Sequence, residues 1–155
     1  PSERATRAEA IAIADSYFDA IEQDNGDIVP LHADCVRLEN GVQTTSNPDR
    51  ARIGRLHVKD GLSSGFYSYI KQIYDRRYPL VDVERGIVLS VIVFEHPGTV
   101  KSVAVEGFGE LELAPFTQKP SSAVIFEAFK VQGGTIRQIE AVLEFLAYGT
   151  KTGWE

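Results

Sequence analysis

The sequence predicts an α+β fold in which N-terminal helices pack on a curved, mostly antiparallel sheet. Three observations indicate this class: a helical stripe of apolar residues near the start, a series of β-branched segments in the second half, and glycine-containing turns between those segments. The 155 residues contain no evident linker, repeat or low-complexity segment. We therefore expect one domain over residues 1–155.

The first helix is expected to run from Ser2, a candidate N-cap, to the turn at Asp24, Asn25 and Gly26. Apolar residues recur along it at intervals of three and four, which is the spacing of one helix face. They are Ala10, Ile13, Ala14, Tyr17, Phe18 and Ile21. A short second helix is expected over residues 27–32, with Asp27 as its cap.

The middle of the chain is expected to hold a strand and a long helix. Residues 35–39 alternate as a strand does, and Asn40 and Gly41 end that strand. A polar loop over residues 44–49 leads to a helix predicted over residues 50–74, with an interruption near Gly61 to Gly65.

The second half of the chain predicts the sheet. β-Branched runs over residues 77–83 and 86–95 predict a hairpin across Glu84 and Arg85, and a third strand is expected within residues 100–113. Residues 122–131 and 135–145 flank a Gln-Gly-Gly turn and predict a final hairpin. Trp154 is expected to anchor the C-terminal tail.

Composition argues against two classes of partner. The chain has 16 basic and 22 acidic residues and a net charge of −6, whereas nucleic-acid binding needs a positive patch. The nearest basic run, Arg50, Arg52, Arg55 and Lys59, has the helical spacing of a solvated face. No apolar stretch approaches the roughly 18 residues of a membrane span. We expect neither nucleic acid nor a membrane as a partner.

Residue spacing gives no support for a metal or a cofactor, so we expect neither. The single cysteine, Cys35, excludes an internal disulfide and a cysteine-based zinc site. Gly107 and Gly109 form an isolated Gly-x-Gly without the helix that a dinucleotide site requires. No secretory signal is visible after Pro1, which favours a cytoplasmic location, with a removed signal sequence as the alternative.

Strand alternation places Cys35, Arg37 and Glu39 on one face of the first strand. If this face lines an apolar cavity, a carboxylate and a guanidinium enter it together. Burial would then favour the protonated acid and Arg37 the carboxylate, and the balance decides whether Glu39 acts as a base. The alternative is a structural ion pair at a rim.

Glu127 and Tyr17 are the other candidates for catalysis. Glu127 lies in an apolar strand, where an ionised carboxyl is costly, so it could stay protonated and donate a hydrogen bond to a developing oxyanion. The alternative is an exposed Glu on the solvent face of the same strand. Tyr17 lies on the apolar helix stripe, and its hydroxyl needs a partner if buried. A core tyrosine with a satisfied hydroxyl is the alternative there.

Several further side chains are candidates for substrate binding. His57 could act as an acid or base, although its neighbours Arg55 and Lys59 favour an exposed position. Arg76 could bind a substrate oxygen or pair with a nearby aspartate. Phe66, Tyr67 and Tyr69 could stack on an aromatic substrate, with an ordinary core role as the alternative. His32 and His96 stand at element ends and are weaker candidates.

Four motifs carry a family resemblance: Tyr17-Phe18-Asp19-Ala20-Ile21, Gly26-Asp27, residues 32–41 and residues 126–136. Together with the order of the elements, they resemble the SnoaL-like family of the nuclear transport factor 2-like (NTF2-like) superfamily. This superfamily has a conical α+β fold. The resemblance covers most of the chain, and the order and spacing of the motifs are more specific than any single one.

Ketosteroid isomerases of this superfamily allow a comparison residue by residue. Their helix-one tyrosine, an oxyanion donor, corresponds to Tyr17, and their general-base aspartate corresponds to Glu39. A supporting tyrosine corresponds to Tyr67 in the Phe66-Tyr67 pair. Their protonated oxyanion-hole aspartate corresponds to Glu127. Both acidic positions carry Glu here in place of Asp.

The resemblance implies a cofactor-independent acid/base enzyme, most simply a lyase (dehydration, or retro-aldol cleavage such as deformylation) or an isomerase, with a small aromatic or polycyclic substrate. In this hypothesis Glu39 is the base, Tyr17 and Glu127 stabilise the oxyanion, and Arg37 or Arg76 orients the substrate. The alternative is a non-catalytic ligand-binding protein or a dimeric interaction module of the same fold. A homodimer or higher homo-oligomer is expected, because alternating apolar residues over 86–95 would otherwise expose a large patch.

Overall fold

The computed structural model describes residues 4–153 of the chain. The α-helices are α1 (Arg7–Glu22) and α2 (Val58–Leu62), and the 3₁₀ turns are η1 (Gly26–Ile28), η2 (Arg52–Arg55) and η3 (Phe66–Tyr69). The strands are β1 (Leu31–Glu39), β2 (Val42–Gln43), β3 (Gln72–Asp82), β4 (Ile87–His96), β5 (Ser102–Val105), β6 (Gly109–Glu112), β7 (Ser121–Gln132) and β8 (Thr135–Leu146).

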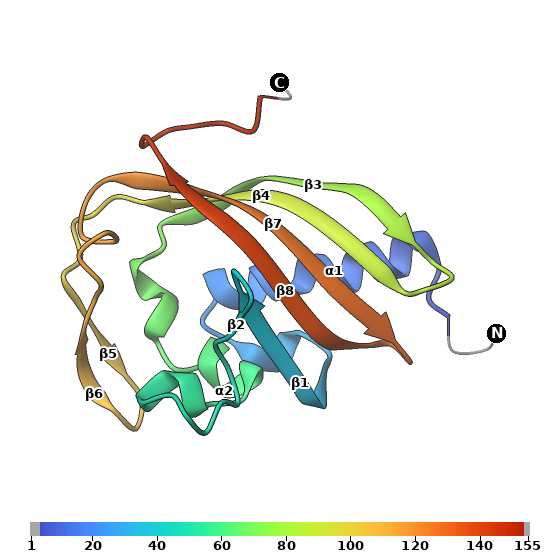
Figure 1. The fold of residues 1–155 in the computed structure, drawn as a ribbon, viewed down its shortest axis with the longest axis horizontal. Helices are drawn as coiled ribbons and strands as arrows, with labels where there is room; N and C mark the ends of the chain where they lie inside the picture. The colour runs from blue at the N-terminus through green and yellow to red at the C-terminus, as the bar shows by residue number, and fades with distance from the viewer. Residues whose placement is uncertain (1–3, 154–155) are drawn as a thin grey trace.

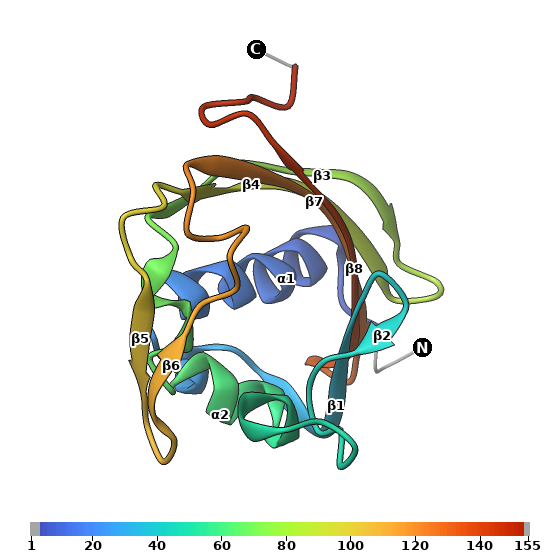
Figure 2. The ribbon, with the colours of Figure 1, turned by 60° about the vertical axis from the view of Figure 1, so that its left-hand side comes forward.

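One curved sheet has the strand order β2-β1-β8-β7-β4-β3, and β5 and β6 form a separate hairpin. Every neighbouring pair is antiparallel except β1 and β8, which are parallel. The sheet arches over α1, and α2 and the β5–β6 hairpin stand on the remaining sides (Figures 1 and 2). This arrangement confirms the predicted fold class, with helices packed on one face of a curved, mostly antiparallel sheet.

Helix α1 begins later than predicted because Thr6 caps it. The Thr6 hydroxyl accepts a hydrogen bond from the Glu9 backbone N–H, and the Glu9 carboxylate accepts one from the Thr6 N–H. The predicted cap, Ser2, lies outside the described residues. The predicted apolar face is confirmed by the buried residues of the helix, which are Ala10, Ala14, Tyr17, Phe18, Ala20 and Ile21.

The helix predicted over residues 27–32 is wrong. Only the η1 turn forms, where the side chain of Asn25 accepts a hydrogen bond from the Asp27 N–H. Strand β1 already begins at Leu31, so His32 is a strand residue. Asp27 is a capping signal in the sequence, but from Leu31 the chain pairs with β8, so these residues do not extend a helix.

The long helix predicted over residues 50–74 is also wrong. This segment holds η2, α2, η3 and the start of β3. The expected interruption is confirmed at Gly65, whose φ is +81° and where a Cβ would lie 2.7 Å from the Ala104 carbonyl oxygen. Only glycine fits this position, and the turn that it permits brings Phe66 and Tyr67 towards the sheet.

The two predicted hairpins of the main sheet are confirmed as β3–β4 and β7–β8. The single strand predicted within residues 100–113 is instead the hairpin β5–β6, because the chain turns at Gly107, whose φ is +76°. Trp154, the predicted anchor of the tail, lies outside the described residues. Within residues 4–153, every helix is too short or too polar to cross a membrane.

The main core lies between α1 and the inner face of the sheet. The Tyr17 and Phe18 rings of α1 meet Phe129 of β7 edge-on, with ring centroids 5.5 and 5.6 Å apart. Charged side chains interrupt this apolar interior at Arg37 and Glu127, which are 4% and 0% exposed. Buried charges need partners, so these residues mark the place to look for a functional site.

Candidate active site

A cavity of about 530 Å³ lies between the inner face of the sheet, η3 and the segment after β6. Strand β1 contributes Arg37 and Glu39 to its wall, and η3 contributes Phe66 and Tyr67. Four of the predicted site residues therefore line one cavity. A wider depression of about 750 Å³ near the start of α1 contains none of them.

Arg37 is held between two carboxyl groups. Its Nε donates a hydrogen bond to Glu127 Oε1 at 2.9 Å, and its Nη1 donates one to Glu39 Oε1. The Arg37 backbone N–H donates to the Thr45 hydroxyl at 2.8 Å, which ties the strand to the following loop. Arg37 and Glu39, which strand alternation places on one face, both lie on the cavity wall.

The two carboxyl groups lie in unequal surroundings. The Glu39 side chain is 38% exposed, whereas that of Glu127 is fully buried. Burial raises the pKa of Glu127 above its ordinary value, against the opposing effect of the Arg37 guanidinium. One guanidinium balances one negative charge, and burial disfavours the ionised form of Glu127, so we expect Glu127 to be the protonated acid of the two.

Glu127 does not line the cavity, and this differs from its predicted role as a direct oxyanion donor. It lies behind Arg37, where its Oε1 accepts from the guanidinium and its Oε2 has no hydrogen-bond partner among the described residues. The prediction of a buried, protonated carboxyl agrees with this environment. Because Glu127 accepts a hydrogen bond from the Arg37 guanidinium, it positions Arg37.

Two tyrosines complete the polar end of the cavity. Tyr17 of α1 and Tyr67 of η3 both lie close to Arg37 and Glu127, and burial raises the pKa of both phenols. Both therefore remain neutral hydrogen-bond donors at physiological pH. Glu39 and Tyr67 line both this cavity and a smaller one of about 260 Å³ beside it, whereas Tyr17 lines only the smaller one, which differs from its predicted role as a direct oxyanion donor in the same cavity.

A row of aromatic rings follows one side of the larger cavity. The rings are Tyr67, Phe66, Tyr69, His96, Phe145 and Phe116, and successive ring centroids lie 4.9–5.7 Å apart. This row begins beside the Arg37 end at Tyr67 and reaches Phe116, which is 56% exposed. Such a surface suits a flat aromatic compound, which gains both apolar burial and ring contacts.

His57 is not brought to this cavity. It is the N-cap of α2, where its Nδ1 accepts a hydrogen bond from the Lys59 N–H at 3.2 Å. Its Nε2 lies 3.2 Å from the His32 carbonyl oxygen. Both ring nitrogens are therefore engaged in joining α2 to β1, and the predicted binding role finds no support in its position.

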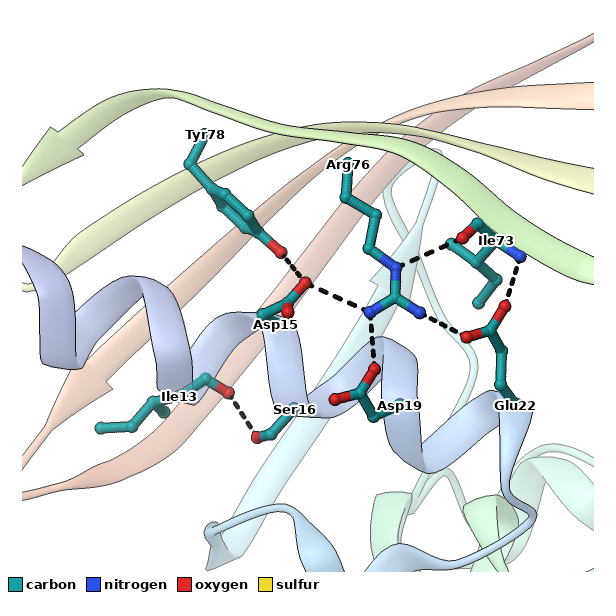
Figure 3. Close-up of polar contacts among 8 residues, drawn as sticks. All are labelled: Ile13, Asp15, Ser16, Asp19, Glu22, Ile73, Arg76 and Tyr78. Atoms are coloured by element: carbon teal, nitrogen blue, oxygen red, sulfur yellow. Dashed lines mark hydrogen bonds and ion pairs between the residues drawn. The ribbon is translucent and has the colours of Figure 1, made fainter.

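Arg76 is likewise placed away from the cavity (Figure 3). Its guanidinium reaches from β3 to α1, where it pairs with Asp15, Asp19 and Glu22 at 3.2, 2.7 and 2.5 Å. It also lies over the Phe18 ring, 5.6 Å from the centroid. The sequence suggested an aspartate partner nearby in the chain, but the carboxylates come from a helix more than fifty residues earlier.

His96, a weaker candidate from the sequence, and Arg50, which the sequence placed in a solvated basic run, also line the cavity. His96 is 3% exposed, and burial lowers its pKa to about 4. Its place at a strand end suggested exposure, because the packing of Tyr69 and Phe145 around it is not visible in local sequence. Arg50 lines both cavities, whereas its spacing suggested a solvated helix face.

Solved structures with the same architecture share little sequence with this chain. A Bacillus subtilis protein provisionally assigned as an isomerase superposes with a TM-score of 0.55, at 8% identity over 88% of this chain and 87% of that one. AusH from Aspergillus nidulans gives 0.51, at 10% identity over 90% and 86%. A Methylobium petroleophilum PM1 protein of unknown function with a cystatin-like fold gives 0.52, at 10% identity over 98% and 85%.

These similarities establish the fold and leave the activity open. The conical α+β fold predicted from the sequence is confirmed, while the superfamily and the narrower SnoaL-like assignment stay predictions. No curated protein matches the sequence. One family, described as a domain of unknown function (DUF8021), matches residues 3–143, and the chain belongs to that family.

Proposed function

We propose that the protein is a cofactor-independent acid/base enzyme, a lyase or isomerase, that acts on a small aromatic or polycyclic compound bound in the larger cavity. One observation carries this proposal: a half-exposed carboxylate, Glu39, shares the cavity wall with the buried guanidinium of Arg37 and with Tyr67. A base and several hydrogen-bond donors thus border a space lined with aromatic rings.

The proposed reaction needs a base and a site for negative charge. The Glu39 carboxylate removes a proton from a carbon next to a carbonyl group, or from a hydroxyl. The electron pair moves to the carbonyl oxygen, where the Tyr67 hydroxyl and Arg37 stabilise the charge, and Tyr17 supports them from the adjoining smaller cavity. Protonated Glu39 then returns the proton to a leaving hydroxyl, a leaving carbon or the isomerised product.

Glu127 has a supporting role in this proposal. It orients the Arg37 guanidinium from behind, and as a neutral acid it leaves the positive charge of Arg37 available to Glu39 and the substrate. A second buried negative charge would oppose the development of an oxyanion nearby.

A phenyl-substituted β-hydroxy ketone, 4-hydroxy-4-phenylbutan-2-one, tests the reaction type directly. Dehydration converts it to benzylideneacetone and water, and retro-aldol cleavage converts it to benzaldehyde and acetone, so product analysis separates the two. We expect Glu39→Gln to lower the rate by roughly 100-fold or more, because it keeps the hydrogen bond to Arg37 and loses the base. Glu144→Gln, an exposed acid on β8, is the matched control.

Binding of the same compound distinguishes the enzyme from a carrier protein. Glu39→Gln should bind the ketone with nearly wild-type affinity while turnover falls. If the wild-type protein binds this ketone and related hydroxy and enolisable ketones without converting any of them, the enzyme proposal fails. The alternative of a non-catalytic ligand-binding module would then account for the cavity.

A further inference from the structure

Two buried polar atoms without partners lie beside each other where His96 lines the far end of the larger cavity. His96 of β4 lies directly opposite Ser121 of β7 in the antiparallel pairing, and they are 3% and 8% exposed. Neither His96 Nδ1 nor Ser121 Oγ has a hydrogen-bond partner within residues 4–153. Residues directly opposite each other in a sheet share a face, so both belong to the inner side, where His96 lines the cavity.

Such a pair needs an explanation, because buried polar atoms are nearly always hydrogen-bonded. The His96 imidazole is neutral, so one ring nitrogen is a donor and the other is an acceptor. A hydroxyl beside it can donate or accept. This corner, formed by His96 and Ser121, can therefore make hydrogen bonds with one additional oxygen atom, from either a hydroxyl or a carbonyl group.

This corner is remote from Arg37 and Glu39. Along the aromatic row, the His96 ring is separated from Tyr67, at the Arg37 end, by the rings of Tyr69 and Phe66, with successive centroids 5.2–5.7 Å apart. Aromatic rings line the cavity between these ends, as described above. Glu112 also lines the cavity, and its charge favours a neutral oxygen over a carboxylate.

We propose that His96, with Ser121 beside it, binds a second oxygen atom of the substrate, which is therefore an elongated polycyclic or biaryl compound with neutral oxygen groups at both ends. This inference rests on the proposed function in one respect, since it takes the Arg37 end as the reacting end. It assigns to His96 a role in selecting the substrate and no part in the chemistry.

Two matched probes test the assignment by calorimetric titration of the whole chain: 4,4′-dihydroxybiphenyl and 4-hydroxybiphenyl. The wild-type protein should bind the dihydroxy compound about two- to tenfold more tightly, as one additional hydrogen bond predicts. His96→Phe keeps an aromatic ring in the row and should abolish this preference, with little change for 4-hydroxybiphenyl. Ser121→Ala should reduce the preference by a smaller factor.

Ser122→Ala is the control, because Ser122 is the next residue of β7, faces the other side and accepts a hydrogen bond from the Gly149 N–H. Its probe preference should equal that of the wild type. Equal binding of both probes by the wild type, or an unchanged preference in His96→Phe, overturns the inference. If the preference holds but no turnover is found with ketones, the second oxygen site stands and the proposed reaction alone fails.

Discussion

The stability of the protein should depend strongly on the residue at position 127, because Glu127 is one of the two acids that contact the buried Arg37 guanidinium. Because Glu127 is fully buried and its pKa is raised, the neutral Glu127→Gln variant should preserve the contact with Arg37 and change the free energy of unfolding by no more than about 1 kcal/mol. Glu127→Leu removes the acceptor of Arg37 Nε and should destabilise the protein by about 3–5 kcal/mol. Urea denaturation at neutral pH measures both. Equal losses in the two variants would contradict this assignment of protonation.

Protonation of the buried His96 imidazole should lower the stability of the folded protein in acid. Its pKa is lowered to about 4 in the folded protein, whereas the unfolded chain binds a proton near pH 6.5. The stability linked to His96 is therefore complete above pH 6.5 and is lost as the pH falls towards 4, by about 3 kcal/mol in total. The difference in unfolding free energy between wild type and His96→Phe should change by this amount over that range. A difference that does not vary with pH would refute the low pKa.

At the scale of single residues, the sequence predicted which side chains share a face or are buried better than it predicted which side chains are in contact. Alternation correctly placed Arg37 and Glu39 on one face, and the apolar neighbours of Glu127 correctly indicated burial. The contact between Arg37 and Glu127 joins positions 90 residues apart, and no local pattern encodes it. For the same reason, the burial of His96 was missed.

At the scale of elements, a cluster of ion pairs joins α1 to β3. Arg76 pairs with Asp15, Asp19 and Glu22, whose side chains are 38%, 45% and 33% exposed. Solvent screens pairs of this kind, so Arg76→Met, which keeps the apolar stem over Phe18, should cost about 1–2 kcal/mol. The loss should shrink in 1 M salt. A salt-independent loss would show that packing and not charge holds this contact.

The errors in element prediction have one physical origin. Residues 66–69 are aromatic and follow a helical stretch, yet Gly65 turns the chain and β3 pairs with β4 soon afterwards. Residues 27–32 carry a capping signal, yet β1 pairs with β8 there. In both places strand pairing took up backbone hydrogen-bonding groups that a helix would have used, and it overrode the local propensity. Hairpins were predicted well because their pairing is local.

For the whole molecule, we expect a second copy of this chain on the outer face of the sheet. Phe126 and Val142 lie opposite each other in the β7–β8 pairing and are 50% and 57% exposed, and Leu80 on β3 is 50% exposed. Exposed acids, Glu140 and Glu144, accompany them on β8. A two-fold arrangement buries the same apolar surface on both copies.

Light scattering during size-exclusion chromatography tests this expectation. The wild-type protein should have twice the chain mass of 17.1 kDa, and Phe126→Lys should shift it to the monomer. The control is Lys130→Gln, further along the same strand. A wild-type monomer at micromolar concentration would exclude the homodimer.

The parallel pairing of β1 with β8 also determines at which stage of folding the candidate site can form. Strand β1 is synthesised before β8 and has to wait for it, because the other strands of the main sheet lie between the two in the sequence. Until then Arg37 has neither Glu127 nor a closed sheet around it. Contacts between such distant segments slow folding, so the protein assembles its site at the end of folding, and a truncated chain lacking β8 would retain hairpins but no site.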